Sequence, residues 1–393
     1  MEKIYKAYKI RLYPNNEQYG LIMQNIGSAR LIYNYFLSLK DNYYKETKTN
    51  LSLKVMKHKL VEMKEQEEYN FLKEVDTMAL TTSLDNLDKA YTNFFKGQTS
   101  HPVFKRKGIR DSYTTNCIRS TYKNRNYSNI EIYIINKTIK LPKIGIVKYR
   151  GYRNMTGFNG RIISVTVSKD ANKIYASITV EEEIAIPKLE YNEWNTIGID
   201  VGVKDLVVTS MGEKYSKIKI DRIENHIKKL QQDLTNKVKE SKNYTKLKNK
   251  IARLYQKIRN KRKYYIHGIS NKLILENNVI VTENLKVKDM IMSDESSKSL
   301  RRGLTNASLS ELVRQLIYKT KWRGKKLIKI NQYYPSSQIC SSCGYQNKET
   351  KDLSLREWTC PRCNHEHDRD INASLNILFQ GILKLYGLKE RMI

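Results

Sequence analysis

Two cysteine pairs near the C-terminus constrain the fold more than any other feature of this chain. Cys340 and Cys343 form one CxxC pair, Cys360 and Cys363 form a second, and sixteen residues separate the pairs. Two cysteines three positions apart can turn their sulfur atoms toward one ion at a tight turn, and two such turns complete a tetrahedron. The spacing therefore predicts a zinc ribbon. Because four thiolates close the coordination shell, the expected single Zn²⁺ is structural.

Two other kinds of metal site compete with a zinc site of four cysteines. His365 and His367 lie next to the second pair and are rival ligands. Because the cysteine set is complete, we expect both imidazoles to contact the ligands or the solvent instead of the ion. Four cysteines can also hold an iron–sulfur cluster, but the paired spacing points away from that alternative.

The charge of the chain indicates a polyanionic partner. Its 393 residues, which suggest two or three structural units, carry 72 Lys and Arg against 40 Asp and Glu, a net charge of +32. Nucleic acid is the leading partner, because phosphate contacts release counterions and supply sequence-independent affinity. An anionic membrane surface is the competing interpretation, but the termini show neither a basic amphipathic anchor nor a lipidation signal. Without a signal peptide or an apolar span of about 20 residues, we expect a cytoplasmic protein and no membrane partner.

The first half of the chain changes its hydrophobic period twice. Residues 5–13 alternate as a strand does, and residues 16–96 follow a helical period whose stripe includes Ile22, Ile26, Ala29, Tyr33 and Phe36. Strand patterns return after residue 96. We therefore predict that the first strand joins a later β unit, with a helical block inserted between them. A change of composition near Pro187 places a boundary at residues 186–194.

The second half combines strands with a basic helical hairpin. Residues 196–210 predict two strands joined by a turn, and 222–265 predict an antiparallel pair of helices. The lysines of this hairpin contact phosphate or form a solvated face, and the sequence does not separate the two. Val279 to Val281 predicts a strand, and Ser308 and Glu311 are spaced as a capping box that opens a helix. Together, the two halves predict an α+β multidomain protein.

Three acidic residues lie beside apolar segments, where burial of an unpaired carboxylate is energetically unfavourable. Asp200 ends an apolar strand, Glu283 ends another, and Asp370 opens a helix after the second cysteine pair. Each alone has an ordinary explanation: a turn cap, a lysine partner or a helix N-cap. Together they favour a divalent cation, because carboxylates beside buried strands need a partner and Mg²⁺ prefers oxygen ligands. Two Mg²⁺ ions can cleave a phosphodiester.

The sequence resembles the TnpB family, which consists of nucleases encoded by insertion sequences and related to compact type V CRISPR effectors. The similar stretches are Lys6–Pro14, Asn93–Lys96, Pro102–Lys107, Gly198–Gly202, Glu283–Leu285, Ser337–Gly344 and His367–Ala373. The zinc ribbon that runs directly into the last acid is the most specific of them. The family pattern selects Asp370 over Asp368 as that acid, so the resemblance assigns catalysis and Mg²⁺ binding to Asp200, Glu283 and Asp370.

The resemblance also implies a domain organisation. Residues 1–15 and 97–188 would form a β-barrel-like WED domain, and 16–96 an inserted helical REC domain. Residues 189–334 and 367–393 would form a RuvC domain with an RNase H fold, and 335–366 the zinc ribbon inserted in it.

The activity that the resemblance implies is RNA-guided cleavage of double-stranded DNA in the bacterial cytosol. A guide RNA from the transposon end would pair with one target strand, and the protein, as a monomer, would read a short adjacent motif. Lys105, Arg106 and Lys107 are candidate nucleic-acid contacts, with Tyr113 nearby for stacking, although a solvated basic turn is an equally good interpretation.

Three rival functions remain. A compact CRISPR effector of the same fold would differ in the RNA that it binds. A repressor would bind DNA without cutting it, which fits less well because all three acids are present. A transposase that joins DNA ends ranks lowest, because no histidine pair with a nucleophilic tyrosine is evident.

Overall fold

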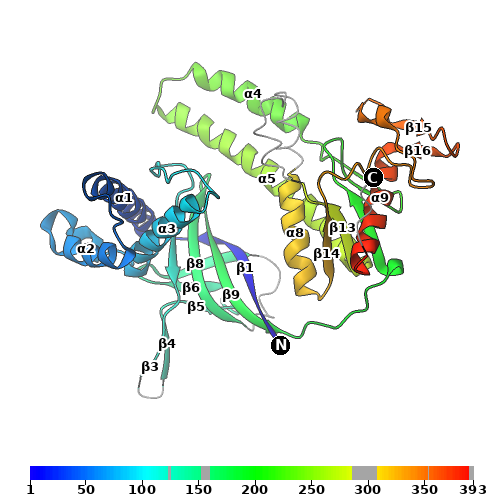
Figure 1. Ribbon diagram of the computed structural model, residues 1–393. Helices are drawn as coiled ribbons and strands as arrows, with labels where there is room; N and C mark the ends of the chain where they lie inside the picture. The colour runs from blue at the N-terminus through cyan, green and yellow to red at the C-terminus, as the bar shows by residue number, and fades with distance from the viewer. Residues whose placement is uncertain (123–124, 152–159, 286–307, 353, 389–393) are drawn as a thin grey trace. The chain divides into compact units, whose positions relative to one another are not determined.

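The structure, a computed structural model, describes residues 1–122, 125–151, 160–285, 308–352 and 354–388. Residues 286–307, part of the range 189–334 expected for the nuclease domain, therefore lie outside the described residues. The chain divides into two compact units, Met1–Ile184 and Ala185–Ile393 (Figure 1). Each unit contains both helices and strands, which confirms the α+β class. None of the described helices combines the length and the apolar character that a membrane span requires.

A curled antiparallel sheet, half of a barrel, forms the frame of the first unit (Figure 1). Its order is β2-β8-β9-β1-β7-β6-β5, so the N-terminal strand lies in the middle of strands that come much later in the chain. The predicted joining of the first strand to the later β unit is therefore confirmed. A separate hairpin of β3 (Arg119–Tyr122) and β4 (Arg125–Ser128) accompanies the sheet. The sheet strands are β1 (Glu2–Tyr13), β2 (Ser112–Asn116), β5 (Glu131–Tyr133), β6 (Thr138–Leu141), β7 (Gly145–Gly151), β8 (Arg161–Asp170) and β9 (Lys173–Ile184).

The helices of the first unit are inserted between β1 and β2, as the period of the sequence predicts. The longest of them begins where Asn15 accepts a hydrogen bond from the Gln18 amide at 2.8 Å, while Gln18 accepts one from the Asn15 amide at 3.2 Å. All five residues of its predicted apolar stripe are buried. The first three pack on the sheet and the last two on the neighbouring helices. The helices are α1 (Asn16–Thr47), α2 (Leu53–Glu65), the 3₁₀ helix η1 (Glu67–Lys73) and α3 (Thr77–Phe95).

The second unit has a mixed five-stranded sheet of order β12-β11-β10-β13-β14. Strands β10, β13 and β14 are parallel, while β11 and β12 are antiparallel additions. Ile199 pairs with Thr282 and Glu283 pairs with Ile330, so Asp200 and Glu283 end neighbouring strands at the same edge. The strands are β10 (Thr196–Asp200), β11 (Asp205–Thr209), β12 (Lys214–Ser216), β13 (Val279–Glu283) and β14 (Lys326–Ile330).

Helices cover both faces of this sheet. Helices α5 (Lys242–Glu276) and α8 (Leu309–Trp322) pack on Ile197, Ile199 and Ile280, whereas α9 (Arg369–Leu385) packs through Ile377 on the opposite face. The predicted hairpin is confirmed as α4 (Asp221–Thr235) and α5, although α5 continues beyond the predicted end at residue 265. Its core is an apolar seam of residues that recur at helical spacing in the sequence: Ile223, Ile227, Leu230, Leu234, Leu247, Ile251, Leu254 and Ile258.

The capping box predicted at Ser308 is absent, so that prediction is wrong. The helix predicted to follow it is present as α8. Ser308 has a φ of 55°, in the left-handed region, and its side chain does not cap α8. An N-cap residue needs extended backbone to aim its hydroxyl at the first free amides. The Glu311 carboxylate instead accepts hydrogen bonds from Arg314 at 2.7 and 2.8 Å and from Gln315 at 2.9 Å.

Two glycines let α9 lie close against the sheet. A Cβ atom at Gly198 of β10 would lie 2.3 Å from the Ser374 carbonyl oxygen, and one at Gly381 would lie 2.2 Å from the Val281 side chain. Such distances are far inside van der Waals contact, so only glycine fits at this approach. The approach places the first turn of α9, which contains Asp370, beside the end of β10.

Gly198→Ala is expected to lower the free energy of unfolding by about 2–3 kcal/mol, because the added methyl group must push α9 away from β10. Urea titration of the purified variant measures the change. Gly268→Ala is the matched control, since Gly268 lies in α5 and a methyl group added to it would have no atom within 4 Å. That substitution should raise stability by about 0.5–1 kcal/mol. Equal stability of the two variants would contradict the close-packing explanation.

Candidate functional site

Three acids from separate segments line one pocket in the second unit. Asp200 comes from the end of β10, Glu283 from the end of β13 and Asp370 from the first turn of α9. The pocket has a volume of about 350 Å³ and is open to solvent. Its lining consists of Asp200, Glu283, Gln332, Tyr333, Tyr334, Pro335, Ser336, Ser337, Gln338, Arg369, Asp370 and Ala373. The fold thus brings together acids that are 83 and 87 positions apart along the sequence.

Asp200 is the most perturbed of the three acids. Burial raises the pKa of its carboxyl group to about 7, and the negative charges of Glu283 and Asp370 act in the same direction. The backbone amide of Val201 and the charge of Arg369 oppose the shift. A carboxylate that is costly to ionise here would be stabilised by a nearby cation, since opposite charge favours the ionised form.

Glu283 is oriented by a residue that sequence reasoning missed. The Ser336 hydroxyl donates a hydrogen bond of 2.6 Å to Oε1 of Glu283. Burial raises the pKa of Glu283, and the bond from Ser336 acts against that shift. Ser336 lies 53 positions away in the segment before the first cysteine pair, so no local pattern connects the two.

Asp370 and Asp368 have different roles in the helix terminus. Asp368 is the N-cap of α9: its Oδ1 accepts hydrogen bonds from the amides of Asp370 at 3.1 Å and Ile371 at 3.0 Å. Its other oxygen pairs with Lys214 at 2.6 Å. Asp370 does not cap the helix and instead lines the pocket. Both of its carboxylate oxygens accept hydrogen bonds from the Arg356 guanidinium at 3.2 Å.

The three carboxylates are chemically suited to Mg²⁺ but are not drawn into one tight cluster. In the part of the chain that the structure describes, the four cysteines are the only group of three or more such residues whose ligand atoms all lie within 4.8 Å of one another. Mg²⁺ is commonly held by one or two carboxylates, with water and substrate oxygens completing its shell. The three carboxylates therefore fit magnesium sites of this kind. Binding an ion would require Asp370 to give up its hydrogen bonds with Arg356.

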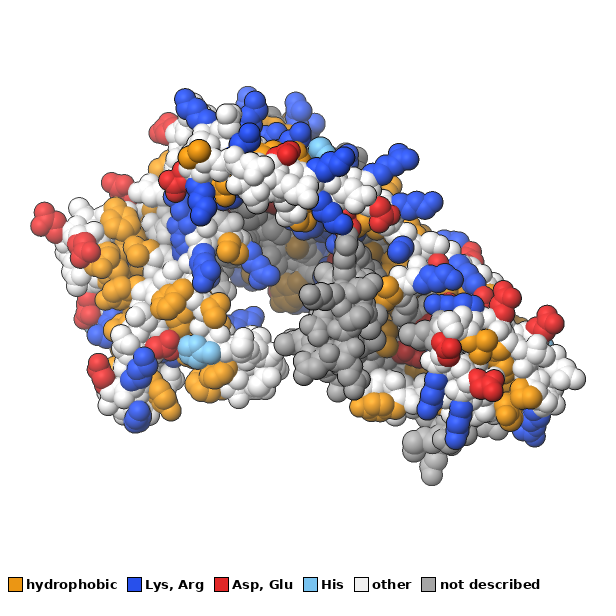
Figure 2. Space-filling model, turned by 90° about the horizontal axis from the view of Figure 1, so that it is seen from above, with side chains coloured by type: hydrophobic (Ala, Val, Ile, Leu, Met, Phe, Trp, Pro, Cys, Tyr) orange, Lys and Arg blue, Asp and Glu red, His pale blue; other side chains and the backbone are white. Residues whose placement is uncertain are grey.

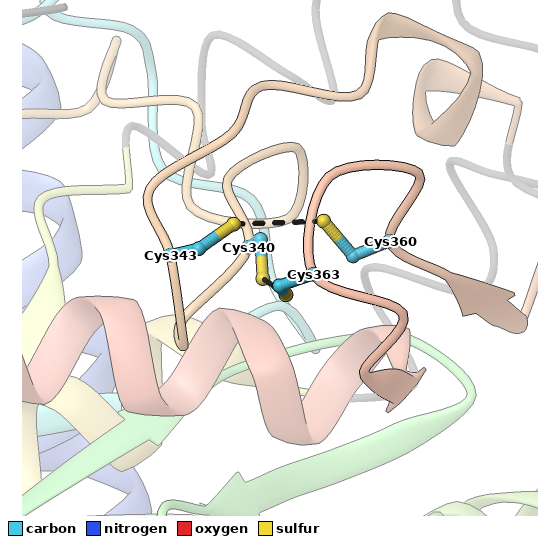
Figure 3. A group of neighbouring side chains, drawn as sticks. All are labelled: Cys340, Cys343, Cys360 and Cys363. Atoms are coloured by element: carbon cyan, nitrogen blue, oxygen red, sulfur yellow. Dashed lines mark hydrogen bonds between the residues drawn. The ribbon is translucent and has the colours of Figure 1, made fainter.

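The four cysteines of the predicted ribbon converge. Figure 3 shows their sulfur atoms pointing toward one another from two loops. The sulfur atoms of Cys340 and Cys363, and those of Cys343 and Cys360, are 3.6 Å apart, too far for disulfides and suitable for a shared ion. The cluster is therefore compatible with Zn²⁺, as the spacing predicts.

Both cysteine turns have the same backbone form. The amide of Gly344 donates to the Cys340 carbonyl, and that of Asn364 to the Cys360 carbonyl, each at 2.8 Å. Gly344 has a φ of 79° and Asn364 a φ of 55°, both in the left-handed region that these residue types tolerate. The second turn thus has Asn364 at the position that Gly344 occupies in the first turn.

His367 contacts a cysteine ligand. Its Nε2 lies 3.0 Å from the Cys340 sulfur, and its ring packs 4.6 Å from that of Trp358. Burial lowers the pKa of His367, which favours the neutral imidazole beside the sulfur. The residue belongs to the hairpin of β15 (Glu357–Thr359) and β16 (Glu366–Asp368), which leads directly into α9.

Two buried asparagines tie the base of the ribbon to α9. Asn372 accepts a hydrogen bond from the Ser341 amide at 2.9 Å and donates one to the Ile339 carbonyl at 2.7 Å. Asn376 donates to the carbonyls of Ile339 at 2.6 Å and Ser336 at 2.8 Å. Two asparagines four positions apart, within an apolar helix, were the sequence signal for this connection. The base of the ribbon is therefore hydrogen-bonded to α9, the helix that carries Asp370 in its first turn.

The first-unit residues proposed for nucleic-acid contact are not equivalent. Lys105, Arg106 and Lys107 are all exposed, but the Lys105 ammonium also lies 3.9 Å from the centre of the Tyr33 ring. The expectation that Tyr113 could stack on a base is wrong, because the alternation of β2 turns its side chain into the core of the sheet, where it is 3 % exposed.

The α4–α5 hairpin carries an open basic pocket of about 650 Å³. Lysine and arginine side chains are frequent on the face of the molecule that Figure 2 shows. Four exposed cations line the pocket with an acid, two amides and a leucine. The lining is Lys237, Lys246, Lys250, Arg253, Asp233, Asn236, Asn243 and Leu247. Exposed cations in this density suit a phosphate backbone.

Three family models match parts of the chain. Residues 177–294 match the IS605 OrfB model described as a probable transposase, and 310–377 match the TNB domain of Cas12f1-like proteins. Residues 1–49 match a model described as a helix-turn-helix domain. In this structure those residues instead form the strand β1 followed by the single long helix α1.

Relatives that match almost the whole chain support the same family as these models. The chain is 31% identical over 388 residues to "Putative RNA-guided DNA endonuclease" of Streptomyces pristinaespiralis, covering 97% of this chain and 90% of that protein. It is 30% identical to "Putative RNA-guided DNA endonuclease InsQ" of Escherichia coli K12, covering 96% and 92%. The fold is similar to Cas12f1 in a complex with sgRNA and target DNA, with a TM-score of 0.54, 13% identity, and 96% and 99% coverage. This chain belongs to the TnpB family, also known as the IS605 OrfB family.

Proposed function

We propose that this protein is an RNA-guided DNA endonuclease that hydrolyses phosphodiester bonds with Mg²⁺ held by Asp200, Glu283 and Asp370. The observation that carries the proposal is the shared pocket, in which burial and two neighbouring acids raise the pKa of Asp200 to about 7. Such a site is unfavourable for an unpaired carboxylate and favourable for a carboxylate that binds a cation. The names of the two whole-chain relatives support the same activity.

The residues in and beside the pocket would have different roles in the reaction. When bound, two Mg²⁺ ions would polarise the scissile phosphate and activate the attacking water. Asp200, which the charges of both other acids influence, is the best candidate for a shared ligand. Ser336 holds the Glu283 carboxylate in one orientation, and Arg356 neutralises Asp370 until the site is loaded.

The two units take the domain roles expected from the family. Residues 1–15 and 97–188 are the WED-like β domain, and 16–96 the REC-like helical domain, which hold the guide RNA and the duplex beside the target. Residues 189–334 and 367–393 are the RuvC-like nuclease domain with an RNase H fold, and 335–366 its structural zinc ribbon. The net charge of +32 and the basic pocket of the hairpin support binding of RNA and DNA. We expect the protein to act as a monomer.

Cleavage of a matched plasmid tests the proposal. The protein is purified with its RNA, the RNA is sequenced, and a plasmid carrying the complementary target beside randomised flanking bases is added with Mg²⁺ or with EDTA. Linear plasmid with Mg²⁺ alone is the expected result, and the flanking bases of the cut molecules define the adjacent motif. Firm binding without cleavage would instead favour a repressor, and an RNA with CRISPR repeats would favour a type V effector.

A further inference from the structure

Tyr333 is a prominent feature of the acid pocket that the proposed chemistry does not use. It lines the pocket together with Asp200, Glu283 and Asp370, yet 81 % of its surface is exposed. Among the described residues, its hydroxyl group makes no hydrogen bond and its ring contacts no other ring. We propose that Tyr333 forms the rim of a nucleotide subsite, where its ring stacks on a base of the DNA strand whose phosphate enters the pocket.

The backbone around Tyr333 is held firmly beside Glu283. Strand β14 ends at Ile330, which pairs with Glu283, and the Asn284 amide donates to the Ile330 carbonyl at 3.2 Å. The Tyr333 amide then donates to the Asn331 side chain at 3.0 Å. Three residues later, Ser336 bonds to the Glu283 carboxylate. Both ends of this short loop are therefore anchored to one acid, so the ring is exposed without being loosely placed.

The neighbouring tyrosine has a different role. Tyr334 is half-buried and packs on the core that Val279, Val281, Ile328, Ile330 and Ile377 form between the sheet and α9. Because Tyr334 supplies the anchoring contact with the core, the exposure of Tyr333 does not result from a loop that failed to pack. A loop that is hydrogen-bonded at both ends and presents one aromatic ring at a polar pocket matches the way proteins stack single-stranded bases.

Arg369 provides an independent indication that the pocket receives a phosphate. This arginine lines the same pocket and is only 8 % exposed. Its Nε has no hydrogen-bond partner among the described residues, although a terminal nitrogen donates to the Asp352 carbonyl at 3.4 Å. A buried guanidinium with an unpaired nitrogen is costly, and the Arg369 side chain, which lines the pocket, supplies a positive charge that a phosphate would pair with. An aromatic rim and a buried donor together match the two halves of a nucleotide.

This inference rests on the proposed nuclease function, and the experiment separates the two. The RNA-bound protein cleaves matched target DNA, and kcat and KM are measured for wild type, Tyr333→Ala and Tyr333→Phe. Loss of one stacked base should raise KM about tenfold in the alanine variant, while the phenylalanine variant keeps the wild-type value. Tyr264→Ala is the matched control, since Tyr264 of α5 is 83 % exposed but does not line the pocket.

Fluorescence gives a second readout that a merely structural role would not change. Target strands with 2-aminopurine at successive positions are bound to Asp200→Ala protein, which holds the strand uncut. One position should be quenched when Tyr333 is present and bright when it is alanine. Wild-type KM and unchanged fluorescence in Tyr333→Ala would overturn the stacking role, as would equal defects in the alanine and phenylalanine variants. Absence of cleavage by the wild type would instead refute the nuclease function itself.

Discussion

Asp200→Ala is expected to reduce DNA cleavage by about 10³-fold while leaving RNA binding and zinc content unchanged. The alanine removes the carboxylate that the charges of Glu283 and Asp370 both influence, which is the proposed shared Mg²⁺ ligand. Stabilisation of the transition state by a bound metal is worth several kcal/mol. Plasmid linearisation measures cleavage, and co-purified RNA per chain measures binding. Joint loss of cleavage and RNA binding would show that the aspartate is structural.

Asp200→Asn adds a test that depends on pH. The folded-state pKa of Asp200 lies near 7, above its ordinary value, so the folded protein without metal binds a proton more tightly than the unfolded chain does. The ionised carboxylate therefore lowers stability as pH rises from about 4 to about 7. In EDTA, the asparagine variant should melt at a higher temperature than wild type at pH 8, and the difference should shrink at pH 5. A constant difference would mean that ionisation of Asp200 is not the cause.

Removal of the zinc site is the second large effect that we expect. Cys360→Ser should reduce bound zinc from one ion per chain toward none and reduce cleavage by about 100-fold, because the ribbon loses the ion that organises it. The loss would spread to the acids through hydrogen bonds that involve Asn372, Asn376 and Ser336, which connect the base of the ribbon to α9 and Glu283. Metal analysis and plasmid cleavage measure the two effects.

Cys117→Ser is the matched control for this variant. Cys117 is the fifth cysteine, lies in the first unit and has its sulfur 3.3 Å from the Ser128 hydroxyl, outside the four-cysteine cluster. The control should keep both its zinc and its activity. A Cys360→Ser protein that lacks zinc and still cleaves at the wild-type rate would disprove the coupling between the ribbon and Asp370.

The sequence alone determined the features that depend on local spacing. Two residues between paired cysteines restrict a turn so strongly that the four-cysteine cluster could be predicted, and it is confirmed. Hydrophobic periods identified the strand β1, the run of helices after it, and the α4–α5 seam. The positions of Asp200 and Glu283 at strand ends, and of Asp370 at a helix start, were equally visible, and their roles remain proposals.

Only the tertiary structure decided which distant groups meet. The bond from Ser336 to Glu283, the pairing of Arg356 with Asp370 and the asparagine links to the ribbon all join segments with no local pattern between them. It also reversed two predictions, since Tyr113 is buried in the sheet and Ser308 does not cap its helix. The physical reason is that period and spacing report the backbone within a few residues. Whether a side chain is exposed, paired or buried depends instead on the elements that pack against it.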